Sequence, residues 1–135
     1  MSNSEPQKAR IPFKLRGDTE PVVVLIHGFL DAGRIWEPVA DWLEADGLST
    51  AVLDLPGMGG TTAAAADISL DRYADDVASV VAELGGEVIL VGQSMGSQIA
   101  ELVAHRLPGQ VKGLVLLTPV PLEGAARDLG NGHAV

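Results

Sequence analysis

The sequence predicts an α/β fold with a parallel sheet and helices on both of its faces. The first observation is that residues 22–26, 49–54 and 87–91 are short runs rich in apolar and β-branched side chains. Such runs are typical of strands that are buried on both faces. The second is that segments with helical spacing separate these runs from one another and from a fourth expected strand at residues 111–118. Strands that alternate with helices form right-handed crossovers between parallel neighbours, which predicts the layered fold.

An edge strand is expected before this core, within a first region at residues 1–20. Ile11, Phe13 and Leu15 occupy alternate positions of the segment 10–16, as the residues of one strand face do. Pro12 has no backbone N–H to donate, so the segment is confined to the edge of the sheet. The residues before it are polar and are expected to form a tail.

Three helices are expected between the parallel strands. The clearest has Ser69 as its N-cap and ends before Gly85. Its apolar positions recur at helical spacing on one face: Leu70, Tyr73, Val77, Val80, Val81 and Leu84. A helix with Pro38 in its first turn precedes it. A third helix ends at Pro108.

The composition describes a small globular domain and excludes several kinds of site. The chain has 135 residues, of which 47% are hydrophobic and 20% are charged. It contains no cysteine, which rules out disulfides, thiolate metal sites and a cysteine nucleophile. Its three histidines lack the spacing of a metal ligand set, and no glycine-rich phosphate motif occurs. We therefore expect neither a metal nor a cofactor.

The charge and the hydropathy predict a cytoplasmic protein that binds neither nucleic acid nor a membrane. Nine basic and 18 acidic residues give a net charge of −9, which disfavours polyanionic partners. No apolar run approaches the roughly 20 residues of a membrane helix. Residues 1–16 lack the uninterrupted apolar core of a signal peptide.

The segment Gly92-Gln93-Ser94-Met95-Gly96 carries the strongest chemical signal. It matches G-x-S-x-G, in which a serine occupies a sharp turn between a strand and a helix. The two glycines let the strand and the helix pass closely, and the strained turn exposes the serine Oγ. Free N–H groups at the helix start stabilise developing negative charge. The pattern predicts Ser94 as a nucleophile, and the alternative is an ordinary turn with a capping serine.

A second signal, His27-Gly28-Phe29, closes the first buried strand. The tetrahedral oxyanion of acyl transfer needs two convergent donors. We expect the backbone N–H groups of Phe29 and Met95 to supply them. His27 has the chemistry of a general base, but we expect a structural histidine of the loop.

Together these segments resemble the α/β-hydrolase superfamily. The resemblance rests on VVVLIHGF at residues 22–29 with Trp36 after it, DLPGMGGT at 54–61, VILVGQSMG at 88–96 and GLVLLTPVPL at 113–122. It implies a three-layer α/β-hydrolase fold, with Ser94 as the nucleophile and Phe29 and Met95 as oxyanion-hole donors. The supporting motif residues are His27, Gly28, Gly92, Gln93 and Gly96. Met58 stands where the family often has histidine, in a structural loop.

The resemblance also implies the amino-terminal half of the family fold, truncated after the strand that follows the elbow helix. Residues 21–122 match that half, and residues 123–135 correspond to the start of a cap or to a disordered tail. The family places an acid and then a histidine after the serine. The downstream candidates are Glu101, His105, Glu123, Asp128 and His133.

None of these candidates is expected to complete the site. Glu123 or Asp128 followed by His133 keeps the family's order, but no strand pattern holds them within hydrogen-bonding reach of the serine. Glu101 and His105 lie four residues apart on a helix and are expected to form a solvated pair. The acid and the base are therefore expected to lie outside this chain.

The expected function is a serine hydrolase that cleaves an ester, thioester, lactone or related bond through an acyl-Ser94 intermediate. The resemblance implies a small-molecule substrate with an apolar acyl part. It also implies an acyl pocket that is lined by Val120, Leu122, Phe29 and Met95. A non-catalytic binding module is possible on the same fold. Among enzymes, the fold also hosts C–C hydrolases, haloperoxidase-like enzymes and lyases. The open apolar edge at residues 111–118 predicts self-association or a need for the missing half.

Overall fold

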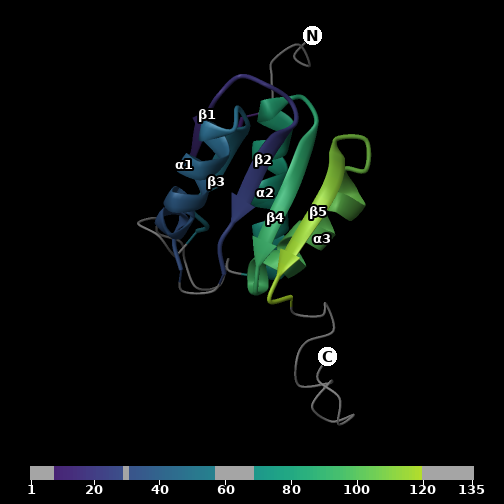
Figure 1. Cartoon of the computed structure of the whole chain (residues 1–135). Coiled ribbons are helices and arrows are strands. Elements are labelled where there is room, and N and C mark those ends of the chain that lie inside the picture. The colour runs from purple at the N-terminus through teal and green to yellow at the C-terminus, as the bar shows by residue number, and fades with distance from the viewer. Residues whose placement is uncertain (1–7, 29–30, 57–68, 120–135) are drawn as a thin grey trace.

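The computed structural model describes residues 8–28, 31–56 and 69–119 of the 135-residue chain. They form a five-stranded sheet in the order β1-β3-β2-β4-β5 (Figure 1). The strands are β1 (Phe13–Arg16), β2 (Val22–Ile26), β3 (Ser49–Leu53), β4 (Val88–Gln93) and β5 (Val111–Leu117). β1 is antiparallel to β3 at one edge, and the other pairs are parallel. The predicted parallel sheet and the edge position of the first strand are confirmed.

Helices lie on both faces of the sheet. They are a 3-10 turn (Gly33–Trp36) that leads into α1 (Glu37–Ala45), then α2 (Leu70–Leu84) and α3 (Met95–Arg106). Figure 1 shows α2 and α3 behind the sheet and α1 in front of its β1 and β3 side. The predicted three-layer arrangement is therefore present, with β4 and β5 more open on the α1 side.

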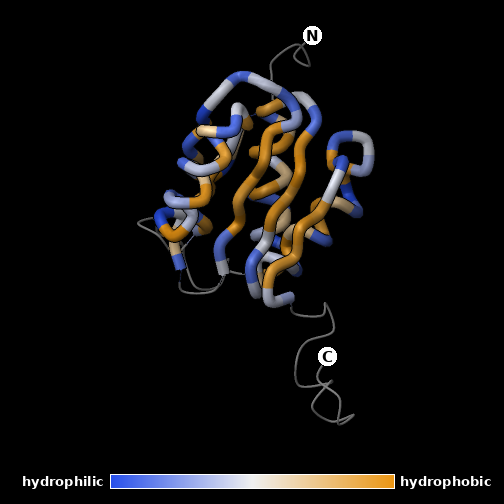
Figure 2. The backbone as a smooth tube through the Cα atoms, viewed as in Figure 1, coloured by the Kyte–Doolittle hydropathy of each residue, from blue (hydrophilic) through white to orange (hydrophobic). Residues whose placement is uncertain are grey.

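Two apolar clusters explain why the central strand is apolar at every position. Val22, Val24 and Ile26 belong to the larger cluster, which packs against α2 and α3. Val23 and Leu25 point the other way and pack with Trp36 and Ala40 from the α1 side. All five residues of β2 are buried. In Figure 2 the orange colour is continuous along β2, as expected for a strand covered on both faces, and it extends over most of β4.

The predicted boundaries of α2 are set by its caps. The Ser69 Oγ accepts a hydrogen bond from the Arg72 N–H at 3.0 Å. At the other end Gly85 has a φ of 78°, and its N–H donates to the Val81 carbonyl. A left-handed residue of this kind favours glycine, so the helix ends where the sequence predicts.

A buried carboxylate attaches the amino-terminal segment to α2. The side chain of Asp76 is fully buried, and its oxygens lie 3.3 Å from Nε of both Arg10 and Arg72. The Arg10 N–H also donates to the Ser79 Oγ at 2.8 Å. These bonds seat Ile11 in the core, where it is 6% exposed. Sequence periodicity did not reveal this attachment, because Arg10 lies outside the helices and strands.

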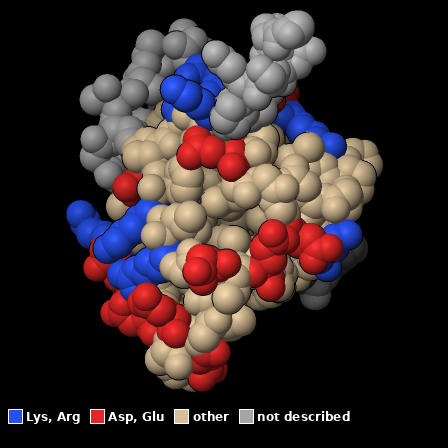
Figure 3. All heavy atoms as spheres, turned by 90° about the horizontal axis from the view of Figure 1, so that it is seen from above, with Lys and Arg blue, Asp and Glu red and all other residues tan. Residues whose placement is uncertain are grey.

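The surface charges are interspersed. Figure 3 shows acidic side chains beside basic ones on the face at the amino ends of the parallel strands. Arg16 pairs with Asp41 and Glu44 on α1, and Lys112 lies 3.8 Å from Glu87. No helix in the described ranges combines the length and the apolar character needed to cross a bilayer.

The β5 edge is apolar and exposed. Leu114, Val115 and Leu117 are 40%, 45% and 42% exposed. Leu114 pairs with Leu90 and Val115 with Val91, so these side chains extend the two faces of β4 outward. Both sheet faces therefore end in open apolar surface at this strand.

Candidate active site

The turn between β4 and α3 has the strained geometry expected of a nucleophile elbow. Ser94 has φ 56° and ψ −119°, a backbone conformation that residues other than glycine rarely adopt. Its N–H donates to the Leu117 carbonyl at 2.9 Å, which fastens the turn to β5. Its carbonyl accepts bonds from Ser97, from the N–H at 2.8 Å and from the Oγ at 2.6 Å. The turn is thus fixed from both sides.

Two glycines allow the close packing that the elbow requires. A β-carbon on Gly92 would overlap the Gly96 carbonyl oxygen. A β-carbon on Gly96 would in turn lie 2.5 Å from the carbonyl oxygen of Ile26. Real β-carbons do not approach backbone oxygens so closely, so the start of α3 can sit against β4 and β2 only with glycine at both positions.

The loop after β2 lies directly against the elbow. A β-carbon on Gly28 would lie 3.2 Å from Cβ of Ser94 and 3.1 Å from the Gln93 carbonyl oxygen. Met95 is the first residue of α3, where backbone N–H groups have no partner within the helix. Its side chain packs against the larger core cluster. Phe29, the other expected donor, lies outside the described residues.

His27 is bonded through both of its ring nitrogens. The residue is fully buried, and Nδ1 lies 2.9 Å from the Gly28 carbonyl oxygen. Because a carbonyl only accepts, Nδ1 carries the proton. Nε2 then accepts a hydrogen bond from the Leu55 N–H at 3.0 Å. Neither nitrogen is available to take a proton from Ser94, which agrees with the structural interpretation of this histidine.

The helical pair Glu101 and His105 lies away from the elbow. His105 lies ten residues after Met95 in α3. At a rise of about 1.5 Å per residue, it is therefore about 15 Å along the helix axis from Met95. His105 is exposed in the last turn of that helix. The remaining candidates, Glu123, Asp128 and His133, lie outside the described residues, as do Met58, Val120 and Leu122.

An acidic residue that the sequence motifs did not single out lies near the elbow. A β-carbon on Gly28 would be 3.8 Å from Oδ2 of Asp31. The Asp31 N–H donates to the Gly28 carbonyl at 3.2 Å, which keeps Asp31 next to Gly28. The sequence could have indicated this proximity. In HGFLD, Asp31 follows Gly28 by three residues, which is the spacing between the first and last residues of a β-turn.

A hollow of about 350 Å³ adjoins the elbow on the α1 side. Its walls include apolar side chains of Ile35, Val39 and Leu117, together with Asp31. Trp36, Gln93 and Thr118 complete the lining. Trp36 Nε1 and Gln93 Oε1 are buried and have no hydrogen-bond partner among the described residues. The hollow therefore combines a mainly apolar wall with a few polar atoms, as small-molecule sites do.

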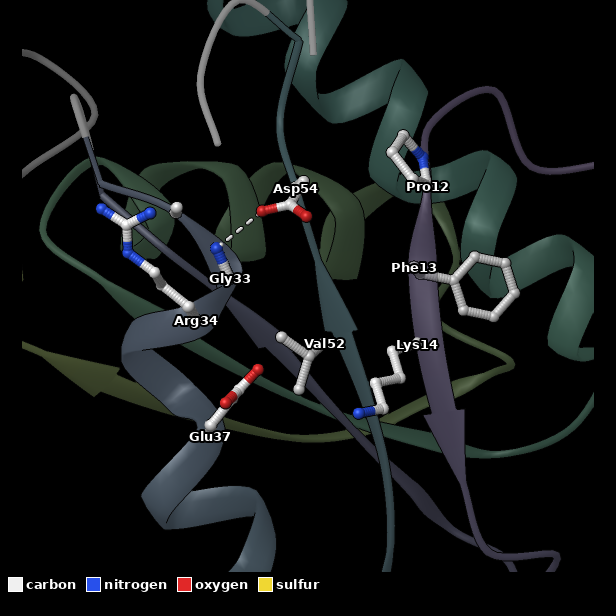
Figure 4. Close-up of a pocket in the computed structure, with 9 residues that line it drawn as sticks. Pro12, Phe13, Lys14, Gly33, Arg34, Glu37, Val52 and Asp54 are labelled. Carbon is white, nitrogen blue, oxygen red and sulfur yellow. Dashed lines mark hydrogen bonds between the residues drawn. The ribbon is translucent and has the colours of Figure 1, made fainter. Parts of the chain in front are cut away.

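A second hollow, of about 310 Å³, lies at the opposite edge of the sheet (Figure 4). Residues of β1, β3, the 3-10 turn and the start of α1 line it, among them Lys14, Arg34 and Glu37. Asp54 accepts the Gly33 N–H at 2.7 Å there, which fastens the 3-10 turn to the end of β3. No elbow residue lines this hollow. Within the described ranges, no group of three or more metal-ligating side chains occurs.

Comparison with known proteins agrees with this geometry. The sequence model of the alpha/beta hydrolase fold family matches residues 21–133. A pyrethroid hydrolase of Sphingobium wenxiniae is 34% identical over 102 residues, which cover 73% of this chain and 35% of that protein. A 2-succinyl-6-hydroxy-2,4-cyclohexadiene-1-carboxylate synthase of Salmonella paratyphi C is 37% identical over 119 residues, which cover 84% of this chain and 42% of the synthase.

A solved structure reproduces the same architecture. The thioesterase domain from the curacin biosynthetic pathway has a TM-score of 0.74 and 31% sequence identity, over 89% of this chain and 46% of that domain. The chain thus spans less than half the length of each of these three proteins. The match over residues 21–133 establishes that the chain belongs to the α/β-hydrolase fold family.

Proposed function

We propose that Ser94 is the nucleophile of a serine hydrolase that cleaves an ester, thioester, lactone or related bond. The observation that carries this proposal is the backbone strain at Ser94, with φ 56° in a residue that is not glycine. Such strain costs about 1–3 kcal/mol and is concentrated at functional sites. An ordinary capping serine has an extended backbone, as Ser69 does with φ −154°.

The proposed reaction proceeds through an acyl-enzyme. The Oγ of Ser94 attacks the acyl carbon, and the carbonyl oxygen becomes a tetrahedral oxyanion. The backbone N–H groups of Phe29 and Met95 stabilise that oxyanion, the leaving group departs with a proton, and water then releases the acyl group. The close approach of Gly28 to Ser94, which leaves little room for a β-carbon on Gly28, and the place of Met95 at the start of α3 support this assignment.

The catalytic base and its acid are proposed to lie outside this chain, in a longer product or in a companion chain. Within the described ranges, His27 has both nitrogens bonded and His105 is remote. Removal of a base lowers the rate by orders of magnitude but leaves roughly 10³–10⁴-fold acceleration over water from the oxyanion hole and binding. We therefore expect slow acylation by the chain alone.

The proposed substrate is a small molecule with an apolar acyl part. The hollow beside the elbow supports this, since Ile35, Val39 and Leu117 form its wall. The relatives named as a pyrethroid hydrolase and as a thioesterase domain agree with ester or thioester chemistry. The relative named as a synthase supports a second candidate, a lyase-type reaction on the same scaffold.

Covalent labelling tests the nucleophile. The chain is incubated with a fluorophosphonate probe, and the label is mapped by mass spectrometry. We expect slow labelling at Ser94 that disappears in Ser94→Ala, with circular dichroism showing that the variant is folded. Labelling that persists in Ser94→Ala contradicts the proposal. Fast, stoichiometric labelling with ester turnover, lost in the variant, would mean that the base lies within this chain.

Complementation tests the missing groups. A polypeptide corresponding to the second half of a family relative, with its acid and histidine, is added to the chain. Restoration of Ser94-dependent ester hydrolysis supports the enzyme. A stable complex without activity favours a binding module on the hydrolase fold instead.

A further inference from the structure

The polar part of the hollow beside the elbow presents mainly hydrogen-bond acceptors. Asp31 brings a carboxylate to the lining, and Gln93 brings an Oε1 that is buried and has no partner among the described residues. The Thr118 hydroxyl donates its proton to the Leu117 carbonyl at 2.7 Å, so toward any other group its Oγ can only accept. Trp36 adds a donor, its indole N–H. A ligand that complements this wall is therefore rich in donors.

Asp31 places a negative charge beside the proposed nucleophile. Its Oδ2 and the Cβ of Ser94 lie 3.8 and 3.2 Å from one point, the position that a β-carbon of Gly28 would take. The bond from the Asp31 N–H to the Gly28 carbonyl holds the backbone of the aspartate in this place. Asp31 forms no ion pair with any other described residue. Its carboxylate is thus available to a cation of the ligand.

The hollow carries no compensating positive charge. None of the described residues that line it is a lysine, an arginine or a histidine. Arg34, the basic residue nearest to Asp31 in the sequence, lines the second hollow instead. An indole ring such as that of Trp36 attracts cations through its π face. The net charge of the whole chain, −9, acts in the same direction. These charges favour a cation in the hollow and disfavour a carboxylate.

We propose that this hollow binds a protonated amine that is carried by the acyl group of the substrate. The ammonium group pairs with the Asp31 carboxylate, while Gln93 Oε1 and Thr118 Oγ are acceptors for its remaining N–H donors. The aliphatic carbons of the acyl group pack on the apolar wall of the hollow. Because Asp31 lies so near Ser94, only a few bonds separate the amine from the acyl carbon. A short aminoacyl ester or thioester has this chemistry.

Binding of three compounds of similar size tests the site in the unmodified chain. Butylammonium, butanol and butanoate are titrated separately into the ¹⁵N-labelled chain at neutral pH, and the backbone NMR signals are followed. We expect butylammonium to shift the N–H signals of Asp31, Gln93 and Leu117, but not that of Lys14 in the second hollow. We expect it to bind about tenfold more tightly than butanol, and butanoate to cause no shift. Equal binding of the three compounds, or shifts spread over all acidic surfaces, overturns the proposal.

Asp31→Asn removes the charge and keeps the size of the side chain. We expect its preference for butylammonium over butanol to fall to about twofold or less, whereas Asp18→Asn retains the full preference. Asp18 is an exposed carboxylate that does not line the hollow, so this control removes the same net charge elsewhere. Circular dichroism checks that both variants are folded. A preference that survives Asp31→Asn, or that both variants lose equally, contradicts the role of Asp31.

The ester or thioester chemistry rests on the proposed function, and a second measurement separates it from amine binding. Two fluorophosphonate probes that differ only in a propyl or a 2-aminoethyl group are compared for the rate at which they label Ser94. We expect the 2-aminoethyl probe to react about fivefold faster with the unmodified chain and to lose this advantage in Asp31→Asn. If neither probe labels Ser94 while butylammonium binds, the proposed function fails and the amine site stands. If both probes label Ser94 at one rate, the proposed function stands and the amine specificity fails.

Discussion

The place that a β-carbon of Gly96 would occupy lies 2.5 Å from the carbonyl oxygen of Ile26. Because the obstacle is backbone on the central strand, Gly96→Ala forces α3 away from the sheet. We expect a loss of at least about 3 kcal/mol in the free energy of unfolding. Urea unfolding followed by circular dichroism measures it. Gly109→Ala is the control, because the added β-carbon would meet no atom of the described residues within 4 Å apart from those of its chain neighbours. Equal stability of the two variants contradicts the close packing.

The strain at Ser94 predicts an unusual order of stabilities. Glycine accepts φ 56° freely, whereas alanine does not. We expect the free energy of unfolding of Ser94→Gly to exceed that of Ser94→Ala by about 1 kcal/mol. This difference is what remains when the greater conformational entropy of glycine in the unfolded chain is set against the relief of backbone strain. At Ala104, within α3, glycine should instead lower stability by about 1 kcal/mol. Ser94→Ala more stable than Ser94→Gly would show that the turn is not strained.

The buried carboxyl of Asp76 predicts a pH dependence. Burial raises the pKa of Asp76 above the ordinary value for an aspartate, although Arg72 and Arg10 lower that pKa in part. The folded state therefore binds this proton more tightly than the unfolded chain does. The stabilisation is complete below the unfolded pKa and is lost as pH rises through the folded pKa.

Asp76→Asn cannot titrate at this position and isolates the effect. We expect the free energy of unfolding of the unmodified chain, minus that of Asp76→Asn, to fall as pH rises from acidic to neutral. Urea unfolding of both proteins at a series of pH values measures the difference. A difference that increases with pH would mean that the arginines outweigh burial.

The exposed β5 edge predicts self-association. Val115 and Leu117 are both more than two fifths exposed, at 45% and 42%, on a strand whose outer side is unpaired within the described residues. We expect oligomers in light scattering, and a shift toward monomer in Val115→Lys. Leu15→Lys at the other edge is the control, because Lys14 and Arg16 already flank that position with charge. A monodisperse monomer of the unmodified chain contradicts the prediction.

The sequence predicted the elements because their causes are local. The apolar run at Val22–Ile26 follows from burial on both faces. Ser69 and Gly85 cap α2 through their own side-chain and backbone chemistry. The elbow was predictable as well, since the two glycines of GQSMG stand where the backbone packs too closely for a β-carbon.

Long-range polar contacts could not be predicted in the same way. The bonds from Arg10 to Asp76 and from His27 to Leu55 join residues that are 66 and 28 positions apart, and no periodic pattern relates such residues. The hollow beside the elbow arises from the 3-10 turn, the start of α1, the end of β4 and the end of β5. Its shape depends on packing between these segments.

The two tryptophans of the chain differ sharply in their surroundings. Trp36 is 5% exposed and lines the hollow beside the elbow, whereas Trp42 is 75% exposed on α1. A Trp42→Phe variant would therefore leave a single indole fluorophore next to the site. Its emission would report in real time on any acyl group or polypeptide that enters the hollow, even when no bond is cleaved.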